Sequence, residues 1–153
     1  MTKSQATLLL TLASAAMILA AWGFQYIGGY PPCKMCYWQR YPHFAAIVIG
    51  GLALALKTKI FAWLGALAML ITAGIGIFHS GVERKLWDGP SSCSSTSIDG
   101  LSSDELFNQI MSAPLVRCDE IPWEMFGLTM ANLNALASLT FAAGWLWVAL
   151  KKD

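Results

Sequence analysis

Four cysteines carry the most evident chemistry in this chain. Cys33 and Cys36 form a Cys-x-x-Cys pair, a spacing at which two thiols can close and reopen a disulfide ring. Cys93 and Cys118 form a second and wider pair. A disulfide relay needs a thiolate, a disulfide that it can attack, and room for the sulfurs to exchange partners. Two cysteine pairs can supply the thiolate and the disulfide. The stretch between Cys93 and Cys118 is rich in serine, which predicts the mobility that an exchange of partners requires.

Two other uses of four cysteines remain open at this stage. The cysteines could form two inert structural disulfides, or they could hold a zinc ion with four thiolate ligands. Only one close Cys-x-x-Cys is present, and the second pair is too wide for the usual zinc knuckle. We therefore expect no metal site.

The composition indicates a membrane protein. Hydrophobic residues make up 56% of the chain and charged residues only 12%. Soluble domains average roughly 45–50% and about 25% for these two classes. A length of 153 residues corresponds to a single domain. No basic stripe suggests binding to nucleic acid.

Four long apolar runs are separated by short polar segments. They predict an all-α membrane protein, a four-transmembrane-helix bundle with helices at about 7–27, 37–56, 60–82 and 126–150. The first run could also be a cleaved signal peptide that follows Lys3. However, it is longer than the roughly 7–15 apolar residues of a signal sequence, so we expect it to span the membrane.

The charges between these runs indicate the orientation. Segments 1–6, 57–59 and 151–153 hold five Lys and Arg residues in 12 positions, whereas 28–40 and 83–125 hold five in 56. Short segments dense in positive charge remain in the cytoplasm. We therefore expect both termini to be cytoplasmic and both cysteine pairs to face outward, where disulfides persist.

The two outward loops are predicted at about 28–36 and 83–125. In the longer loop, Ser102 and Glu105 have the spacing of a helix capping box. An apolar stripe follows this box, at Leu106, Phe107, Ile110 and Met111. The pattern predicts a short amphipathic helix on the membrane surface. The alternative is a helix that packs on its own loop.

Arg40 and His79 are the candidate contacts for an electron acceptor, whereas His43 is expected to be structural. An arginine at a membrane boundary either anchors to lipid headgroups or donates to a bound polar group. The chain has no glycine-rich dinucleotide fingerprint and no obvious haem or iron–sulfur ligand set. A quinone whose carbonyl oxygen meets Arg40 would supply the missing acceptor. His79, near the end of the third run, is either a second polar contact or an interfacial residue.

One local pattern and the order of the cysteine pairs match a known family. The pattern is Pro32-Cys33-x-x-Cys36-x-x-x-Arg40, followed by Cys93 and Cys118 in the second outward loop. Together with the four predicted spans, it resembles the bacterial disulfide bond formation protein B (DsbB) family over essentially the whole chain. Three further stretches look like family features: Gly89-Pro90, Cys118-Asp119 and Phe126-Gly127-Leu128.

The resemblance implies an inner-membrane enzyme that re-oxidises a periplasmic thioredoxin-fold oxidase of the DsbA type. Electrons would pass to a membrane quinone, either ubiquinone or menaquinone. By position, Cys93 would be attacked by the partner's thiolate, Cys118 would be released and join Cys33, and Cys36 would face the quinone. Arg40 falls on the quinone-linked arginine of the family. His79 aligns approximately with a histidine near the end of the third span.

One residue departs from the family pattern. The best-known members carry an acidic residue where this chain has Gln39, so a charge pairing beside Arg40 would be absent. We expect this change to alter quinone affinity rather than the chemistry.

Three alternatives to this function remain. A related DsbI-like branch serves a dedicated partner instead of a general oxidase. A non-enzymatic membrane subunit would use the cysteines only as structural disulfides. A vitamin K epoxide reductase-like enzyme also uses a quinone and a four-helix core, but the order of its cysteine loops differs.

Overall fold

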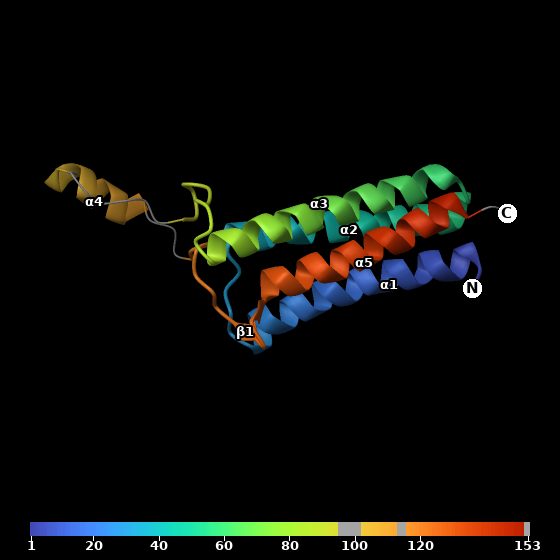
Figure 1. Ribbon diagram of the computed structural model, residues 1–153, viewed down its shortest axis with the longest axis horizontal. Helices are drawn as coiled ribbons and strands as arrows, with labels where there is room; N and C mark the ends of the chain where they lie inside the picture. Colours follow the sequence, from blue (N-terminus) through green and yellow to red (C-terminus); the bar gives the residue numbers. More distant parts are fainter. Residues whose placement is uncertain (95–101, 113–115, 152–153) are drawn as a thin grey trace.

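Four long helices lie side by side in one bundle, with both ends of the chain at the same end of it (Figure 1). The computed structural model describes residues 1–94, 102–112 and 116–151. In chain order the bundle contains α1 (Lys3–Trp22) with a π-helical turn η1 (Gly23–Ile27), α2 (Lys34–Leu56), α3 (Lys59–Glu83) and α5 (Met130–Leu150).

Small residues allow the helices to approach closely. Trp145 of α5 is fully buried, and its indole ring lies over Gly65 of α3. Met69 and a series of buried alanines complete this core, with Ala46 from α2, Ala62 and Ala66 from α3, and Ala142 from α5. Close contact between helix backbones is typical of membrane bundles, where packing replaces the hydrophobic effect.

Three helices of the described chain are long and apolar enough to cross a membrane. They cover Lys3–Ile27, Lys59–Glu83 and Met130–Leu150. Helix α2 has 23 residues, but Lys34, Gln39 and Arg40 lower the hydropathy of its first turns. The predicted fourth span therefore remains a prediction.

Helices α1 and α2 begin earlier than the apolar runs suggest. Helix α1 starts at Lys3 instead of residue 7, because Thr2 and Gln5 form a capping box that holds a polar first turn. Helix α2 starts at Lys34 instead of residue 37, because the sulfur of Cys33 accepts the N–H of Cys36 and caps the helix. Pro42 consequently lies well inside α2 and not in its first turns.

Helix α5 begins later than predicted, at Met130 instead of residue 126. The preceding residues form a small antiparallel hairpin of β1 (Glu124–Met125) and β2 (Leu128–Thr129). Its turn residues Phe126 and Gly127 both have positive φ angles, of 52° and 77°, which suit a tight hairpin turn. The side chain of Thr129 then caps α5.

A short helix, α4 (Ser103–Ser112), occupies the second loop and lies apart from the bundle (Figure 1). The expected box is present, since Ser102 N donates to Glu105 Oε2 over 2.9 Å and Glu105 N donates to Ser102 Oγ over 3.4 Å. The Ser102 hydroxyl also donates to Glu105 Oε2 over 2.7 Å, and this bond together with the one from Ser102 N holds the pKa of Glu105 below its ordinary value. Phe107, Ile110 and Met111 are exposed, and a location of α4 on the membrane surface remains a prediction.

Two glycines of α3 form a matched test of this packing. A Cβ atom on Gly65 would lie 2.5–2.8 Å from three atoms of the Trp145 ring, whereas a Cβ on Gly74 would meet nothing within 4 Å. Gly65→Ala is therefore expected to destabilise the fold by about 1–3 kcal/mol. Gly74→Ala should stabilise it by about 0.5–1 kcal/mol through helix propensity. Thermal unfolding in detergent, followed by circular dichroism, measures both. A Gly65→Ala protein as stable as Gly74→Ala would contradict the packing of α3 against α5.

Candidate redox site

The structure holds the two cysteine pairs in different redox states. Cys93 and Cys118 form a disulfide with their Cα atoms 5.3 Å apart. Cys33 and Cys36 are free thiols whose sulfurs lie 2.9 Å apart. At this distance the two sulfurs form a hydrogen bond in which either thiol can be the donor, and such a bond would stabilise a thiolate on the other sulfur.

The first pair is positioned by the start of α2. Cys33 is the capping residue, and its sulfur accepts the backbone N–H of Cys36 over 3.2 Å. The positive end of the helix dipole therefore lies at these sulfurs and favours a thiolate.

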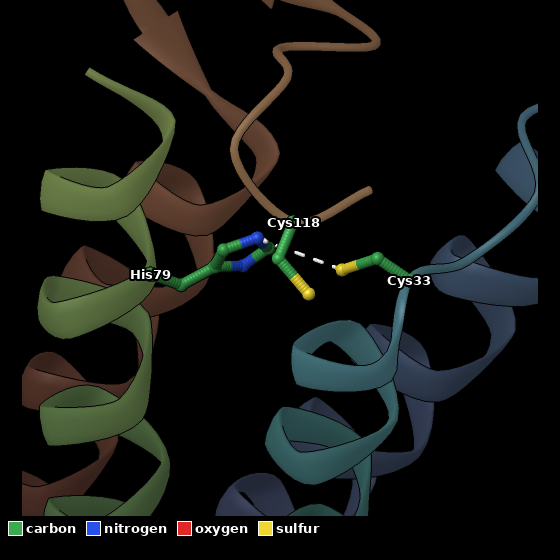
Figure 2. A group of neighbouring side chains, drawn as sticks. All are labelled: Cys33, His79 and Cys118. Carbon is green, nitrogen blue, oxygen red and sulfur yellow. Dashed lines mark hydrogen bonds between the residues drawn. The ribbon is translucent and has the colours of Figure 1, made fainter. Parts of the chain in front are cut away.

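The loop that carries Cys118 brings the second pair onto the first. The sulfurs of Cys33 and Cys118 and a ring nitrogen of His79 all lie within 4.8 Å of one another (Figure 2). Cys118 N donates to the carbonyl oxygen of Cys93 over 2.6 Å, which holds the loop in place. Such a group could suggest a metal site, but a disulfide sulfur provides no thiolate ligand. The arrangement instead places two sulfurs of different pairs close to exchange distance.

The sulfur cluster is buried, although it lies at one end of the bundle. Cys33, Cys93 and Cys118 pack with Met35 and Val82 in a small apolar core. Cys93 is 1% exposed and Cys118 is not exposed at all. A protein that attacks Cys93 must therefore displace part of the loop.

Arg40 is half-buried and held in a defined direction. Its Nη1 donates to Gln25 Oε1 over 2.7 Å, and its Nη2 donates to the carbonyl oxygen of Ala21 over 3.5 Å. Its guanidinium also lies over the ring of Tyr37, 5.2 Å from the centroid. Gln25 belongs to the π-helical turn η1, so this turn orients the arginine.

A cavity of about 510 Å³ connects the first cysteine pair to Arg40. Its volume lies in the range of roughly 300–1,000 Å³ that is usual for small-molecule sites. The polar groups on its wall include Cys36, Arg40 and His79, and apolar side chains such as Met17, Ile18 and Phe24 of α1 and η1 cover another part of the wall. An apolar cavity with a thiol and an oriented cation fits a flat, lipid-soluble molecule that carries carbonyl oxygens.

Gln39 and Asn134 join the two histidines in a buried polar network that the sequence analysis missed. Gln39 Nε2 lies 2.9 Å from His79 Nδ1, and Gln39 Oε1 accepts from Asn134 Nδ2 over 2.8 Å. Asn134 Oδ1 lies 3.0 Å from Nε2 of His43. Gln39 therefore faces His79 and Asn134, whereas Arg40 donates to Gln25 and Ala21. The available signal was the presence of side-chain amides within otherwise apolar runs.

Glu83 is a second residue that the sequence analysis did not assign to the site. It is 5% exposed, and its Oε1 lies 3.7 Å from His79 Nε2. Its other oxygen, Oε2, has no hydrogen-bond partner among the described residues. The four-residue spacing from His79 along α3 was the available signal.

The structure thus gathers the six candidate catalytic and quinone-binding residues at one end of the bundle. These residues are Cys33, Cys36, Cys93, Cys118, Arg40 and His79. Their roles in catalysis and quinone binding remain predictions.

Comparisons with known proteins point to one family. The model of the family described as "Disulfide bond formation protein DsbB" matches residues 3–148. Disulfide bond formation protein B of Shewanella sp. (strain MR-4) is 31% identical over 136 residues, which cover 85% of this chain and 77% of the relative. The protein of the same name from Actinobacillus pleuropneumoniae serotype 5b (strain L20) is 30% identical over 154 residues, which cover 96% of this chain and 86% of the relative. No solved structure matches the chain significantly.

The family match, the helical fold and the cysteine pairs indicate the same kind of protein. The apolar helices and the family support an inner-membrane location. The names of the relatives imply disulfide oxidoreductase chemistry, which the two cysteine pairs can supply. This chain therefore belongs to the DsbB family of disulfide bond formation proteins.

Proposed function

We propose that this protein is a thiol–quinone oxidoreductase that re-oxidises a periplasmic thioredoxin-fold oxidase of the DsbA type. Electrons enter at the Cys93–Cys118 disulfide, pass through Cys33 and Cys36, and leave to ubiquinone or menaquinone. One observation carries the proposal: the free pair Cys33–Cys36 lies between the sulfur of Cys118 and the cavity that contains Arg40.

The proposal includes the topology of the chain. Helix α2 is the fourth span, and its polar first turns lie at the outer edge of the membrane beside the sulfur cluster. Both termini are cytoplasmic, and the loops at about 28–36 and 83–125 are periplasmic. The dense positive charge of the segments at the other end of the bundle supports this orientation.

The first step is a thiol–disulfide exchange at Cys93. A thiolate of the partner attacks the Cys93 sulfur, a mixed disulfide forms, and Cys118 leaves as a thiolate. The Cys118 thiolate then attacks Cys33 while the first pair is a disulfide, and Cys36 leaves as a thiolate. The short separation of the Cys33 and Cys118 sulfurs supports this order.

The next exchanges restore the second pair. The partner's other thiol attacks its own sulfur in the mixed disulfide, so the partner leaves oxidised and Cys93 is left as a thiolate. Cys93 then attacks Cys118, the Cys93–Cys118 disulfide re-forms, and Cys33 leaves as a thiolate. The pattern in the structure, a free Cys33–Cys36 pair beside a closed Cys93–Cys118 bond, is the state that follows these steps.

The cavity is the place where the first pair gives up its electrons. A bound quinone supplies the electron sink, since it takes up two electrons and two protons and leaves as hydroquinone. Cys33 and Cys36 would lose two electrons as their disulfide closes, and the two protons released from the partner's thiols in the exchange steps balance those that the quinone takes up. Arg40, held by Gln25, donates to a carbonyl oxygen, and the apolar walls exclude water from the sulfurs.

The energetics favour such an acceptor. An oxidase of the DsbA type is a strong oxidant, with a reduction potential of about −120 mV. The free-energy change for drawing electrons from this oxidase by thiol exchange alone is therefore close to zero. Transfer to a quinone makes the overall cycle favourable.

Serine substitutions test the relay. Cys36→Ser and Cys93→Ser are each expected to abolish turnover, because each removes one sulfur of the electron path. Ser91→Ala, next to the second pair, should retain it. The assay measures quinone reduction by a reduced thioredoxin-fold partner. Near-normal quinone reduction by either cysteine variant would contradict the relay and would favour cysteines that serve only as structural disulfides.

Arg40→Ala tests the cavity. Removal of a hydrogen bond from a charged donor costs about 1.5–3 kcal/mol. Quinone affinity should therefore fall by roughly ten- to a hundredfold. Lys34→Gln is the matched control, because it removes a positive charge from the same helix but its side chain donates to Ser92. Quenching of tryptophan fluorescence by added quinone measures the affinity. Equal affinities of the two variants would exclude Arg40 from the quinone site.

A further inference from the structure

The surroundings of His79 fix which of its ring nitrogens carries the proton. A backbone carbonyl only accepts, so the Gln39 atom 3.2 Å from the carbonyl oxygen of Met35 is the donor Nε2. The same Nε2 lies 2.9 Å from His79 Nδ1. His79 Nδ1 is therefore the acceptor, and the neutral ring carries its proton on Nε2.

The amide of Gln39 cannot turn over to reverse this assignment. Its Oε1 accepts from Asn134 Nδ2 over 2.8 Å, so a flip would lose the bonds to both Asn134 and Met35. Thr72 further fixes the helix, since its hydroxyl donates to the carbonyl oxygen of Gln39 over 2.9 Å. Gln39 is 6% exposed, so water does not compete for these bonds.

Nε2 of His79 faces the sulfur cluster, where the backbone of Cys118 is also a hydrogen-bond partner of the ring. Nε2 lies 3.5 Å from the sulfur of Cys33, drawn as the dashed line in Figure 2, and 3.7 Å from Glu83 Oε1. The backbone N–H of Cys36 is a second donor to the same sulfur, over 3.2 Å. Two N–H groups that face one sulfur favour its anionic form, whereas the hydrogen bond to the Cys36 sulfur and burial raise the pKa of Cys33 and oppose that form.

We propose that Gln39 is a positioning residue that keeps the proton of His79 on Nε2, where it stabilises Cys33 as a leaving thiolate. This inference rests on the proposed function. In the step concerned, the Cys93 thiolate attacks Cys118, the Cys33–Cys118 bond breaks, and Cys33 departs with the electron pair. A thiol that is more stable as an anion leaves faster, and no proton moves in this step.

Gln39→Glu tests the proposal because a carboxylate can only accept. It should draw the His79 proton to Nδ1 and leave a bare lone pair on Nε2 facing Cys33. Nitrogen NMR of the imidazole side chains reports the tautomer directly. The chain has two histidines, so comparison with His79→Gln identifies the signals of His79. Gln109→Glu, the same substitution in α4, should leave those signals unchanged.

A second readout concerns the sulfur itself. In a Cys36→Ser background, Gln39→Glu should slow the alkylation of Cys33 by iodoacetamide at pH 7 by about tenfold, equivalent to one pKa unit. A wild-type His79 that carries its proton on Nδ1, or an unchanged tautomer and alkylation rate in Gln39→Glu, would overturn the inference. Neither readout uses turnover. A wild-type protein that fails to reduce quinone would therefore overturn the proposed function separately.

A second cavity lies at the opposite end of the bundle and supports an independent inference. It has a volume of about 400 Å³ and is formed by the ends of α1, α2, α3 and α5. Its lining contains no acidic residue of the described chain. It does contain four lysines, each from a different place in the sequence: Lys3, Lys57, Lys59 and Lys151.

Two of these lysines and one helix end have no partner within the described residues. The side chains of Lys57 and Lys59 make no hydrogen bond or ion pair there, whereas Lys151 Nζ donates to the carbonyl oxygen of Met1. Helix α3 begins at Lys59, and the side chain of Thr58 does not cap it. The first N–H groups of a helix attract anions, and basic cavities between the ends of membrane helices bind lipid headgroups.

We infer that this cavity binds the phosphate of an anionic phospholipid headgroup. Its lysines supply the positive charge, and Thr58 and Ser4 add hydroxyl groups. Ala53, Leu54, Ala62 and Val148 form an apolar part of the wall, which suits an acyl chain and offers nothing to free phosphate.

Thermal unfolding of the delipidated protein in detergent tests this assignment. Added phosphatidylglycerol should raise the unfolding temperature by several degrees, and phosphatidylcholine should not. The double variant Lys57→Gln/Lys59→Gln should lose this response, whereas Lys85→Gln, a lysine just beyond the opposite end of α3, should keep it. Equal shifts with both lipids, or an unchanged response of the double variant, would overturn the site. An equal shift with inorganic phosphate alone would overturn the assignment to a lipid.

Discussion

The whole site depends on one contact, where the segment that carries Cys118 lies against the N-terminal turn of α2. Disulfide exchange requires sulfurs that can come into direct contact, and here the sulfurs of Cys33 and Cys118 lie within 4.8 Å. Met35 and Val82 bury this contact, so apolar packing holds a loop segment against the helix that it must serve. A loop free in solvent would reach Cys33 only in a small fraction of its conformations.

Polar groups within an apolar bundle are costly unless each finds a partner. Gln39, Asn134 and Thr72 satisfy one another across α2, α5 and α3, and this network leaves Nδ1 of His79 with a defined acceptor role. The packing of the helices therefore determines a chemical property of the site, the position of one proton. The core of small residues around Trp145 contributes to this packing, because it fixes the distance between α3 and α5.

Much of the architecture could be predicted from the sequence, because long apolar runs predict helices that can span a membrane. The chemistry-bearing cysteines and Arg40 were also evident from residue type and spacing. The network was not, because Gln39, Thr72 and Asn134 come from three different helices, and the sequence does not tell which side chains of separate helices meet. The hairpin before α5 was hidden because Phe126 and Leu128 are apolar and, in the sequence pattern, extend the apolar run that follows them. Glu83 was placed in the loop predicted at 83–125, because a lone carboxylate at the end of a span carries no signal of burial.

The central claim is that electrons cross from the second cysteine pair to the first through a bond between Cys118 and Cys33. Its most direct test is disulfide mapping by mass spectrometry. The reaction of quinone-oxidised protein with a reduced thioredoxin-fold partner is quenched with acid during the first turnover and then mapped. The account predicts a transient peptide pair that links Cys33 to Cys118, which appears after the mixed disulfide at Cys93 and disappears as Cys93–Cys118 re-forms. Turnover that proceeds with only Cys33–Cys36 and Cys93–Cys118 links at every time point would contradict it.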